Sequence, residues 1–404
     1  MSAPADSEPH RILADLLTQA KTNRRYDIGF PGATDISFAE LGEWLTGQLL
    51  NNVGDPWDAG HGKNHTKNLE QQVVHLVADL LRAPAGHWGY ITTGATEGTL
   101  HALDEAWQAY PDCVVYASSA AHYSVAKAAR LLKLPLVLVH TDTTGRMDIS
   151  HLRRELAWRR DRAAMIVATA GTTMTEAVDH VDAITAVCDQ LDIYRRRVHV
   201  DAALSGIPLA LLAERDRPQF DFTAGATSMV ISGHKFLSTL TPCGVLVYAR
   251  PPHATGSAVA YTGSVDTTIT GSRSGHTPLL LWWVLTTLGE DGLRRRADEA
   301  RSLAAYTHRR LCDVGWPAQR NPHAFTVTLA SPPPAVRAKW VLADDGQVAH
   351  IICMPGMTRP QIDDFVTDLT TSLRVVPAPR RARLEGKSAP SLPTAVQATG
   401  LYAA

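Results

Sequence analysis

The chain of 404 residues lacks a long hydrophobic run. A helix needs about 20 mostly apolar residues to cross a bilayer, and no segment of this sequence approaches that length, so we expect no membrane partner. The first residues, Met1 to Pro9, are acidic and rich in proline, without the basic and then apolar order of a signal peptide. We therefore expect a cytoplasmic protein.

The sequence also lacks an excess of charge and any pairing of its cysteines. Its 39 basic and 40 acidic side chains give a formal net charge of −1, with no long basic stripe. Binding to a nucleic-acid backbone needs concentrated positive charge, so we expect no DNA or RNA partner. The five cysteines are scattered and form no CxxC pair, which predicts neither a disulfide framework nor a metal site.

Hydrophobic residues make up 45% of the chain, enough for a large core and two or more domains. Short apolar or β-branched runs alternate with helical stretches, a pattern typical of parallel strands that are buried on both faces in an α/β domain. The runs are Val114–Ala117, Leu136–His140, Met165–Thr169, Val198–Asp201, Met229–Ser232 and Val245–Tyr248.

The spacing of apolar residues predicts a helical arm over His10–Thr22, a helix over Asn68–Arg82 and a long buried helix that begins near Leu279. We divide the chain into an N-terminal arm and loop (residues 1–60), a large domain (61–285), a small C-terminal α+β domain (286–376) and a flexible, proline-rich tail (377–404). We interpret the run Arg294–Arg296 as a solvated helix face.

The tetrapeptide Ser232-Gly233-His234-Lys235 directly follows a buried apolar run. A lysine at the mouth of a buried strand loses hydration, which lowers its pKa and suits its amine to a Schiff base. A surface lysine in an ordinary turn explains the tetrapeptide equally well when it is taken alone.

Two further strand ends carry polar side chains. Asp201 ends an apolar run, and a buried carboxylate needs a cationic partner. The protonated ring nitrogen of pyridoxal phosphate is one such partner, and an aspartate that caps the next helix is the alternative. His122 is placed to stack on a cofactor ring, although a lone histidine in such a position is more often a packed or solvent-facing residue.

The segment Thr92–Gly98 precedes an apolar helical pattern. Its small residues let backbone N–H groups approach a phosphate at a helix N-terminus, although many such turns only cap helices. This turn, His122, Asp201 and Lys235 each follow a strand. Because the carboxyl ends of parallel strands meet at one edge of a sheet, we expect all four to share one pocket.

The order of these motifs resembles the fold-type I, pyridoxal-phosphate-dependent group II amino acid decarboxylases, and among them the bacterial histidine decarboxylases and plant serine decarboxylases. The similarity extends from about Tyr26 to about Leu373. The matching motifs are NNVGDP (51–56), WGY (88–90), TEG (96–98), HYSVAK (122–127), GTT (171–173), DAALSG (201–206), SGHK (232–235), PCG (242–244) and GSR (271–273).

The resemblance implies that Lys235 holds pyridoxal 5'-phosphate as an internal aldimine. Asp201 would then pair with the ring nitrogen, His122 would stack on one face of the ring and Ala203 would pack on the other. The hydroxyl of the ring would be reached by Thr172 or Thr173. The implied phosphate ligands are Thr93, Gly94, Ala95, Thr96, Ser232 and His234.

The implied activity is decarboxylation of an L-amino acid through an external aldimine and a quinonoid. The substrate's α-carbon is then reprotonated, and Tyr261 and the released Lys235 are the candidate proton donors. The family is dimeric with active sites at the subunit interface, which implies a homodimer in which the segment from Tyr261 to Arg273 serves the partner's site.

One departure from the family concerns the substrate. His61-Gly62 stands where the relatives have Asn-Tyr. Loss of an aromatic ring would enlarge the pocket and the histidine would add a polar group, so we interpret His61 and Gly62 as substrate-binding residues and expect neither free histidine nor free serine as the substrate. A solvent-facing loop would make the exchange neutral.

The alternative reaction that this departure favours uses a bulkier amino acid, such as an S-conjugated cysteine of secondary metabolism. Its outcome would be oxidative deamination to an aldehyde or loss of the β-substituent. An aminotransferase would hold the α-carboxylate with an arginine, for which we find no convincing candidate between Asn321 and Met357. A non-catalytic protein that binds pyridoxal phosphate is the alternative of another class.

Overall fold

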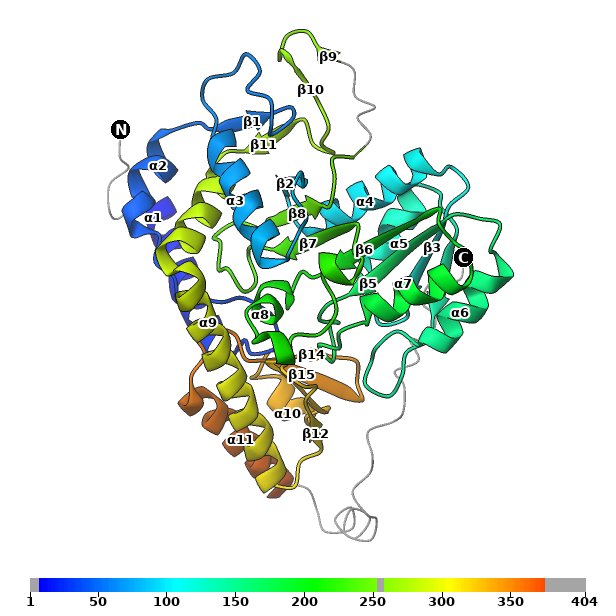
Figure 1. Cartoon of the computed structure of the whole chain (residues 1–404). Helices are drawn as coiled ribbons and strands as arrows, with labels where there is room; N and C mark the ends of the chain where they lie inside the picture. Colours follow the sequence, from blue (N-terminus) through cyan, green and yellow to red (C-terminus); the bar gives the residue numbers. More distant parts are fainter. Residues whose placement is uncertain (1–6, 253–257, 375–404) are drawn as a thin grey trace.

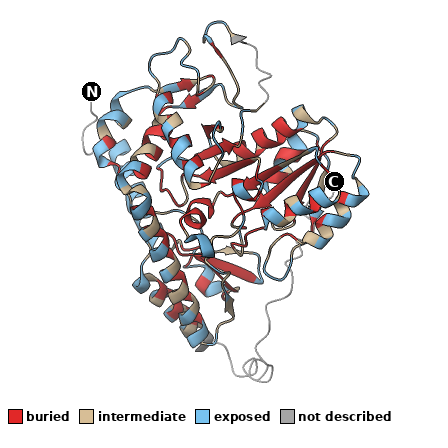
Figure 2. Ribbon diagram, viewed as in Figure 1, coloured by how far each residue is buried: buried red, intermediate tan, exposed pale blue. Residues whose placement is uncertain are grey.

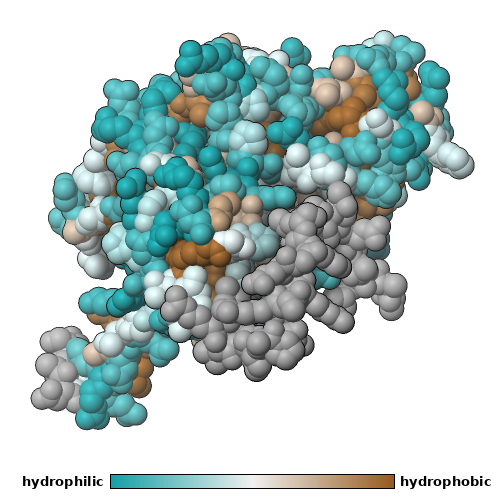
Figure 3. Space-filling model, turned by 90° about the horizontal axis from the view of Figure 1, so that it is seen from below, coloured by the Kyte–Doolittle hydropathy of each residue, from teal (hydrophilic) through white to brown (hydrophobic). Residues whose placement is uncertain are grey.

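The computed structural model describes residues 7–252 and 258–374. The tail expected at 377–404 lies outside these residues. Figure 1 shows a large domain built on a central sheet, a small domain below it, and the long helix α9 (His276–Asp313), which runs along both. Within the described ranges, no helix has the length and apolar character that crossing a bilayer requires. The face shown in Figure 3 is mainly hydrophilic, with its hydrophobic residues in separate patches.

The central sheet has seven strands in the order β2-β8-β7-β6-β5-β3-β4. Their bounds are β2 (Trp88–Thr92), β3 (Val114–Ser118), β4 (Leu136–Val139), β5 (Ala164–Thr169), β6 (Arg196–Asp201), β7 (Ser228–Ser232) and β8 (Gly244–Tyr248). All six expected strands belong to this sheet, and the fold-type I α/β class is confirmed. The expectation of parallel pairing is wrong for β8, which is antiparallel to β7 and β2. The loop 233–243 that joins β7 to β8 is shorter than the helical crossover that a parallel pair needs.

Helices cover both faces of the sheet (Figure 1). In β3, Val114 and Tyr116 join the core on one face, whereas Val115 and Ala117 join the core on the other. Successive side chains of a strand point to opposite faces, so strands covered on both sides are mostly apolar. Figure 2 shows most of the central sheet as buried. The covering helices are α3 (Lys67–Leu80), α4 (Ala95–Ala109), α5 (Ser124–Leu131), α6 (Ile149–Trp158), α7 (Val181–Gln190) and α8 (Gly206–Ala210).

The small domain has a four-stranded antiparallel sheet in the order β12-β13-β15-β14. Its elements are β12 (Ala318–Gln319), β13 (Thr326–Ala330), α10 (Pro334–Arg337), β14 (Ala343–Asp344), β15 (Val348–Ile352) and α11 (Arg359–Arg374). The N-terminal segment joins this domain, because Ile28 N–H donates to Val341 O at 3.2 Å and Ile28 O accepts from Ile352 N–H at 2.9 Å. The exposed helix α1 (Glu8–Tyr26) precedes that segment.

Five further short elements belong to the described fold. Helix α2 (Gly42–Gly47) leads into β1 (Asn51–Val53), which pairs with β11 (Ser272–Ser274). Strands β9 (Ala258–Val259) and β10 (Ser264–Val265) form a hairpin that projects from the top of the molecule in Figure 1.

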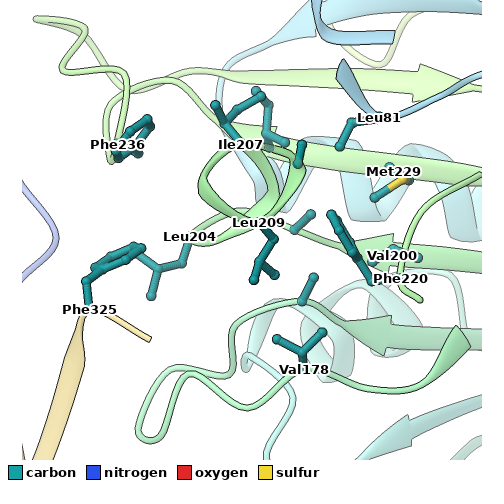
Figure 4. Packing of buried hydrophobic residues seen from close by; sticks show 14 of the residues in the cluster. Leu81, Val178, Val200, Leu204, Ile207, Leu209, Phe220, Met229, Phe236 and Phe325 are labelled. Atoms are coloured by element: carbon teal, nitrogen blue, oxygen red, sulfur yellow. The ribbon is translucent and has the colours of Figure 1, made fainter. Parts of the chain in front are cut away.

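Glu176 connects the two domains behind the carboxyl end of β5. Its carboxyl group accepts hydrogen bonds from Ser205 Oγ at 2.8 Å and from the N–H groups of Phe325 and Thr326, at the start of β13, at 3.0 and 2.7 Å. Complete burial raises the pKa of Glu176 to about 7, although these hydrogen bonds oppose the rise. Residues of both domains also share one core cluster, part of which is shown in Figure 4 with Leu204 and Phe325.

The expectation of a solvated face at Arg294–Arg296 is wrong for Arg296. Arg295 is exposed, but Arg296 is buried with Leu293 and Ala297. These positions are three and four residues apart, so they lie on one face of α9, and that face packs against the body of the protein. A run of like charges therefore conceals one arginine that points inward.

Candidate active site

The carboxyl ends of β2, β3, β5, β6 and β7 meet at one edge of the sheet and surround a cavity of about 540 Å³. This volume lies in the range of roughly 300–1,000 Å³ that is usual for small-molecule sites. Eleven of the sequence-predicted residues line it, namely Thr93, Gly94, Ala95, Thr96, His122, Thr173, Asp201, Ala203, Ser232, His234 and Lys235. Another cavity of about 700 Å³, between α1 and α11, carries none of the predicted residues.

Lys235 and Asp201 place an amine and a carboxylate in the same cavity. Asp201 is the last residue of β6 and is 5% exposed, and its Oδ1 accepts a hydrogen bond from Ala203 N–H at 3.1 Å. Burial lowers the pKa of Lys235, while the negative charge of Asp201 raises it, and the net shift is downward. A lowered pKa increases the fraction of neutral amine, which is the form that condenses with an aldehyde.

His122 presents a neutral ring to the cavity. Its Nδ1 lies 2.8 Å from Ser124 Oγ, which fixes the ring. Burial lowers the pKa of His122, Asp201 opposes that shift, and the positive charges of Lys235 and Lys127 add to it. An uncharged, fixed imidazole is suited to stacking on a planar cofactor ring.

The turn before α4 offers backbone donors, but not those of Thr93. The Oε2 atom of Glu97 accepts hydrogen bonds from Thr93 N–H at 2.8 Å and from Thr93 Oγ1 at 2.6 Å. The first N–H groups of a helix have no acceptor within the helix, so those of Ala95 and Thr96 are suited to bind an anion. Gly244 leaves room for this turn, since a Cβ atom there would lie 2.7 Å from Thr92 Oγ1.

His234 and Ser232 border the same turn. The Nδ1 atom of His234 lies 3.0 Å from Cys243 O and 3.1 Å from Cys243 N, so its Nε2 remains for the cavity. Burial lowers the pKa of His234, which favours the neutral ring. Ser232 is buried at the end of β7 and lines the cavity with its neighbour.

Of the two candidate threonines, Thr173 lines the cavity and Thr172 does not. Thr172 is 1% exposed, and its Oγ1 accepts a hydrogen bond from Ala177 N–H at 2.9 Å. Sequence reasoning missed Thr169, the last residue of β5, whose buried hydroxyl has no partner in the described part of the chain. Thr169 is the last residue of an expected strand, and this position could have identified it as a site residue.

Other lining residues were also missed. Glu97 and Tyr123 are direct neighbours of predicted residues, whereas Ile269 and Thr270 come from the distant segment that follows β10. No local pattern links residues 269–270 to the strand ends, so only the folded chain shows their role as one wall of the cavity.

Tyr261, His61 and Gly62 do not line this cavity. Tyr261 is 85% exposed, between β9 and β10. His61 N–H donates to Thr262 O at 2.8 Å, and the His61 ring packs against Gly263, where a Cβ atom would approach it to 2.6 Å. The three residues therefore belong to one projecting unit, formed by residues 54–62 and the β9–β10 hairpin.

Arg273 is buried within its own chain. It is the last residue of the segment from Tyr261 to Arg273, which was expected to serve the partner's site. It forms an ion pair with Glu70 and donates to Gly54 O at 3.1 Å. Glu70 also accepts the N–H of Ile91 in β2 at 2.9 Å. The Gly-Ser-Arg motif thus supports the strand that precedes the anion-binding turn.

These observations fit pyridoxal phosphate. The cavity combines a buried amine of lowered pKa, a carboxylate for a cationic ring nitrogen and a neutral imidazole for the ring. It also offers the free amides of a helix N-terminus for a phosphate and the unpartnered hydroxyl of Thr169. The fold and this donor set define a fold-type I pyridoxal phosphate enzyme.

Comparison with known proteins gives the family. A sequence profile described as "Pyridoxal-dependent decarboxylase conserved domain" matches residues 5–314. The chain belongs to this family: it is a pyridoxal-phosphate-dependent carboxy-lyase of amino acid metabolism.

Among characterised relatives, a histidine decarboxylase of Mesorhizobium japonicum is 37% identical over 91% of this chain and 100% of the relative. Serine decarboxylase 1 of Oryza sativa is 34% identical over 86% of this chain and 72% of the relative. The fold is also that of L-methionine decarboxylase from Streptomyces sp. 590, with a TM-score of 0.81 and 23% identity, covering 92% of this chain and 96% of that chain.

The electrostatic link between Asp201 and Lys235 is testable in the cofactor-free protein. Because the Asp201 carboxylate favours the ammonium form, Asp201→Asn is expected to lower the pKa of Lys235 further. The pH dependence of Lys235 modification by acetic anhydride, read by peptide mass spectrometry, should shift to lower pH. Asp216→Asn, on the surface, serves as the control, and an unchanged or raised midpoint in Asp201→Asn would contradict the arrangement.

Proposed function

We propose that this protein releases CO₂ from an L-amino acid, as histidine and serine decarboxylases do. It then returns a proton to the α-carbon, which yields a primary amine. The observation that carries the proposal is the convergence of Lys235, Asp201, His122 and the α4 N-terminus on one cavity. The identities of 37% and 34% to a histidine and a serine decarboxylase support decarboxylation of an amino acid.

We assign the residues as follows. Lys235 binds the cofactor's aldehyde carbon through its neutral amine, and Asp201 holds a proton on the ring nitrogen by its negative charge. His122 and Ala203, which both line the cavity, would hold the cofactor ring. The phosphate is bound by the amides of Ala95 and Thr96 together with Ser232 and His234. When bound, pyridoxal phosphate supplies an electron sink for the pair released with CO₂.

The cavity lining also bears on the substrate side chain. Within the described part of the chain, the lining contains the acidic Glu97 and Asp201 and no arginine. Lys235 and Asp201 are assigned to the cofactor, so an acidic side chain would meet the carboxylate of Glu97 with no arginine to pair with. Ile269 and Tyr123 supply apolar surface instead. These features favour an amino acid with a neutral or basic side chain.

The active protein is proposed to be a homodimer in which Tyr261, His61 and Gly62 serve the partner's cavity. Tyr261 is exposed and does not line the cavity of its own chain. Helix α1 has no buried residue and exposes Ile12, Leu13, Leu16 and Leu17 along its length. An apolar face of this kind is typical of a subunit contact. Tyr261 of one subunit, or Lys235 of the other, is then the proton donor to the α-carbon.

The substrate and outcome are tested by a panel of amino acids that includes histidine, serine, methionine and S-alkyl cysteines. We expect CO₂ and the amine in equal amounts, with no H₂O₂, ammonia or pyruvate. Asp201→Asn should lower turnover by about 10²-fold, because a preorganised charge at the reacting group is lost. Lys235→Ala is the control for background release.

Three other results would contradict decarboxylation to an amine. Aldehyde with H₂O₂ and ammonia would instead identify oxidative deamination, and pyruvate with a thiol would identify loss of a β-substituent from an S-conjugated cysteine. Bound cofactor without turnover of any amino acid would identify a non-catalytic binding protein.

The shared site is tested by mixing two inactive variants, Lys235→Ala and Tyr261→Ala. If Tyr261 acts across a dimer, a mixed dimer has one site with both residues intact, and random mixing should restore about a quarter of wild-type activity. Activity is measured as CO₂ release after co-expression of the two chains. Full activity of Tyr261→Ala alone, or no recovery in the mixture, would contradict the assignment.

A further inference from the structure

The turn that carries Lys235 has an unfavourable backbone conformation. Lys235 O accepts a hydrogen bond from Ser238 N–H at 3.2 Å, and Thr239 N–H donates to Gly233 O at 3.1 Å. Ser238 closes the turn with a φ of 57°, in the left-handed region that residues other than glycine rarely adopt. Contacts from outside the turn are therefore needed to hold it in place.

Arg296 of α9 supplies those contacts. Its Nη2 atom donates to Ser238 Oγ at 2.5 Å, and its Nη1 atom donates to the carbonyl oxygen of Phe236. The guanidinium carbon lies 4.8 Å from the centroid of the Phe236 ring. Phe236, the residue after Lys235, is buried in the core cluster shown in Figure 4. One buried side chain thus holds two of the three residues that follow Lys235.

Asp35, in the N-terminal segment, holds Arg296 in turn. Arg296 Nε donates to Asp35 Oδ2 at 2.6 Å and Nη2 donates to Oδ1 at 2.5 Å, while Ser238 Oγ lies 3.3 Å from Oδ1. Burial raises the pKa of Asp35, but the hydrogen bonds and charge of Arg296 lower it by more. The carboxylate is therefore charged at neutral pH and matches the planar guanidinium at two points, which a lysine cannot reproduce.

We propose that Arg296 and Asp35 are positioning residues, the Arg296–Asp35 clamp, which fixes the turn that carries Lys235 and thereby the place of its amine in the cavity. The inference rests on the proposed role of Lys235. Neither clamp residue lines the cavity, so the clamp acts from behind the turn. A displacement of about 1 Å can slow a reaction by about 10²-fold, because bond formation depends on the placement of the reacting atoms.

The clamp is tested with Arg296→Lys and Asp35→Asn, and Arg294→Lys on the same helix is the matched control. Arg294 is half-buried and donates to Leu211 O, away from the Lys235 turn. The first readout is the rate constant for covalent capture of pyridoxal phosphate by the cofactor-free protein. The capture is monitored by the change in absorbance. We expect Arg296→Lys to lower it by about tenfold or more, Asp35→Asn to lower it less, and the control to leave it unchanged.

A second readout separates positioning from general stability. Burial lowers the pKa of Lys235, so a loosened turn that lets water reach the amine should raise the midpoint of its modification by acetic anhydride. The groups that face the amine electrostatically, Asp201, His122 and His234, are unchanged in these variants. A loss of stability alone would lower the melting temperature and leave this midpoint at its wild-type value.

Wild-type capture rate and midpoint in folded Arg296→Lys and Asp35→Asn would overturn the clamp. If Arg296→Lys does not fold, Asp35→Asn decides, because it keeps the arginine and removes only the anion that orients it. Both readouts are independent of turnover. A wild-type protein that captures the cofactor at Lys235 but releases no CO₂ from any amino acid would contradict the proposed function and leave the clamp result standing.

Discussion

The active site depends on a buried amine and a buried carboxylate that share one cavity. Taking Lys235 out of water favours its neutral form, and Asp201 limits that shift by favouring the ammonium. Neither group is stable in such a place without a partner. A cofactor that offers an aldehyde to the amine and a cationic ring nitrogen to the carboxylate satisfies both groups at once.

The fold brings these groups together because β6 and β7, which lead to them, are parallel strands. Strands β6 and β7 are neighbours that run in the same direction, so the residues after their carboxyl ends are close in space. The antiparallel β8 returns beside β7 and places Gly244 against the turn before α4, where only a small residue fits. Behind the cavity, Glu176 and Arg296 connect the loops after β5 and β7 to the small domain and to α9.

Much of this arrangement was predictable from the sequence. Strands buried on both faces appear in the sequence as continuous apolar runs. Active-site residues of such sheets follow the carboxyl ends of the strands, so Lys235, Asp201 and His122 could be placed at one edge of the sheet. The direction of β8 could not be predicted, because apolar runs carry no sign of strand direction. Residues 269–270 were missed because they reach the cavity from a distant segment.

The differences between the predicted and the observed positions of other residues also have specific physical causes. Arg296 lies in a run of three arginines, and only the helical phase of α9 turns it inward. Thr93 was expected to bind phosphate, yet both of its donors are taken by Glu97, a contact that no spacing rule predicts. Tyr261 was assigned to the site by family resemblance and His61 by a departure from the family pattern, and within one chain neither residue lines the cavity.

The most direct measurement is reduction of the pyridoxal phosphate-loaded protein with borohydride, followed by mass spectrometry of its peptides. We expect a stable pyridoxyl group on Lys235, and its loss in Lys235→Ala. A label on a different lysine, such as the neighbouring Lys127, or no label after loading, would contradict the assignment of Lys235 as the residue that binds the cofactor.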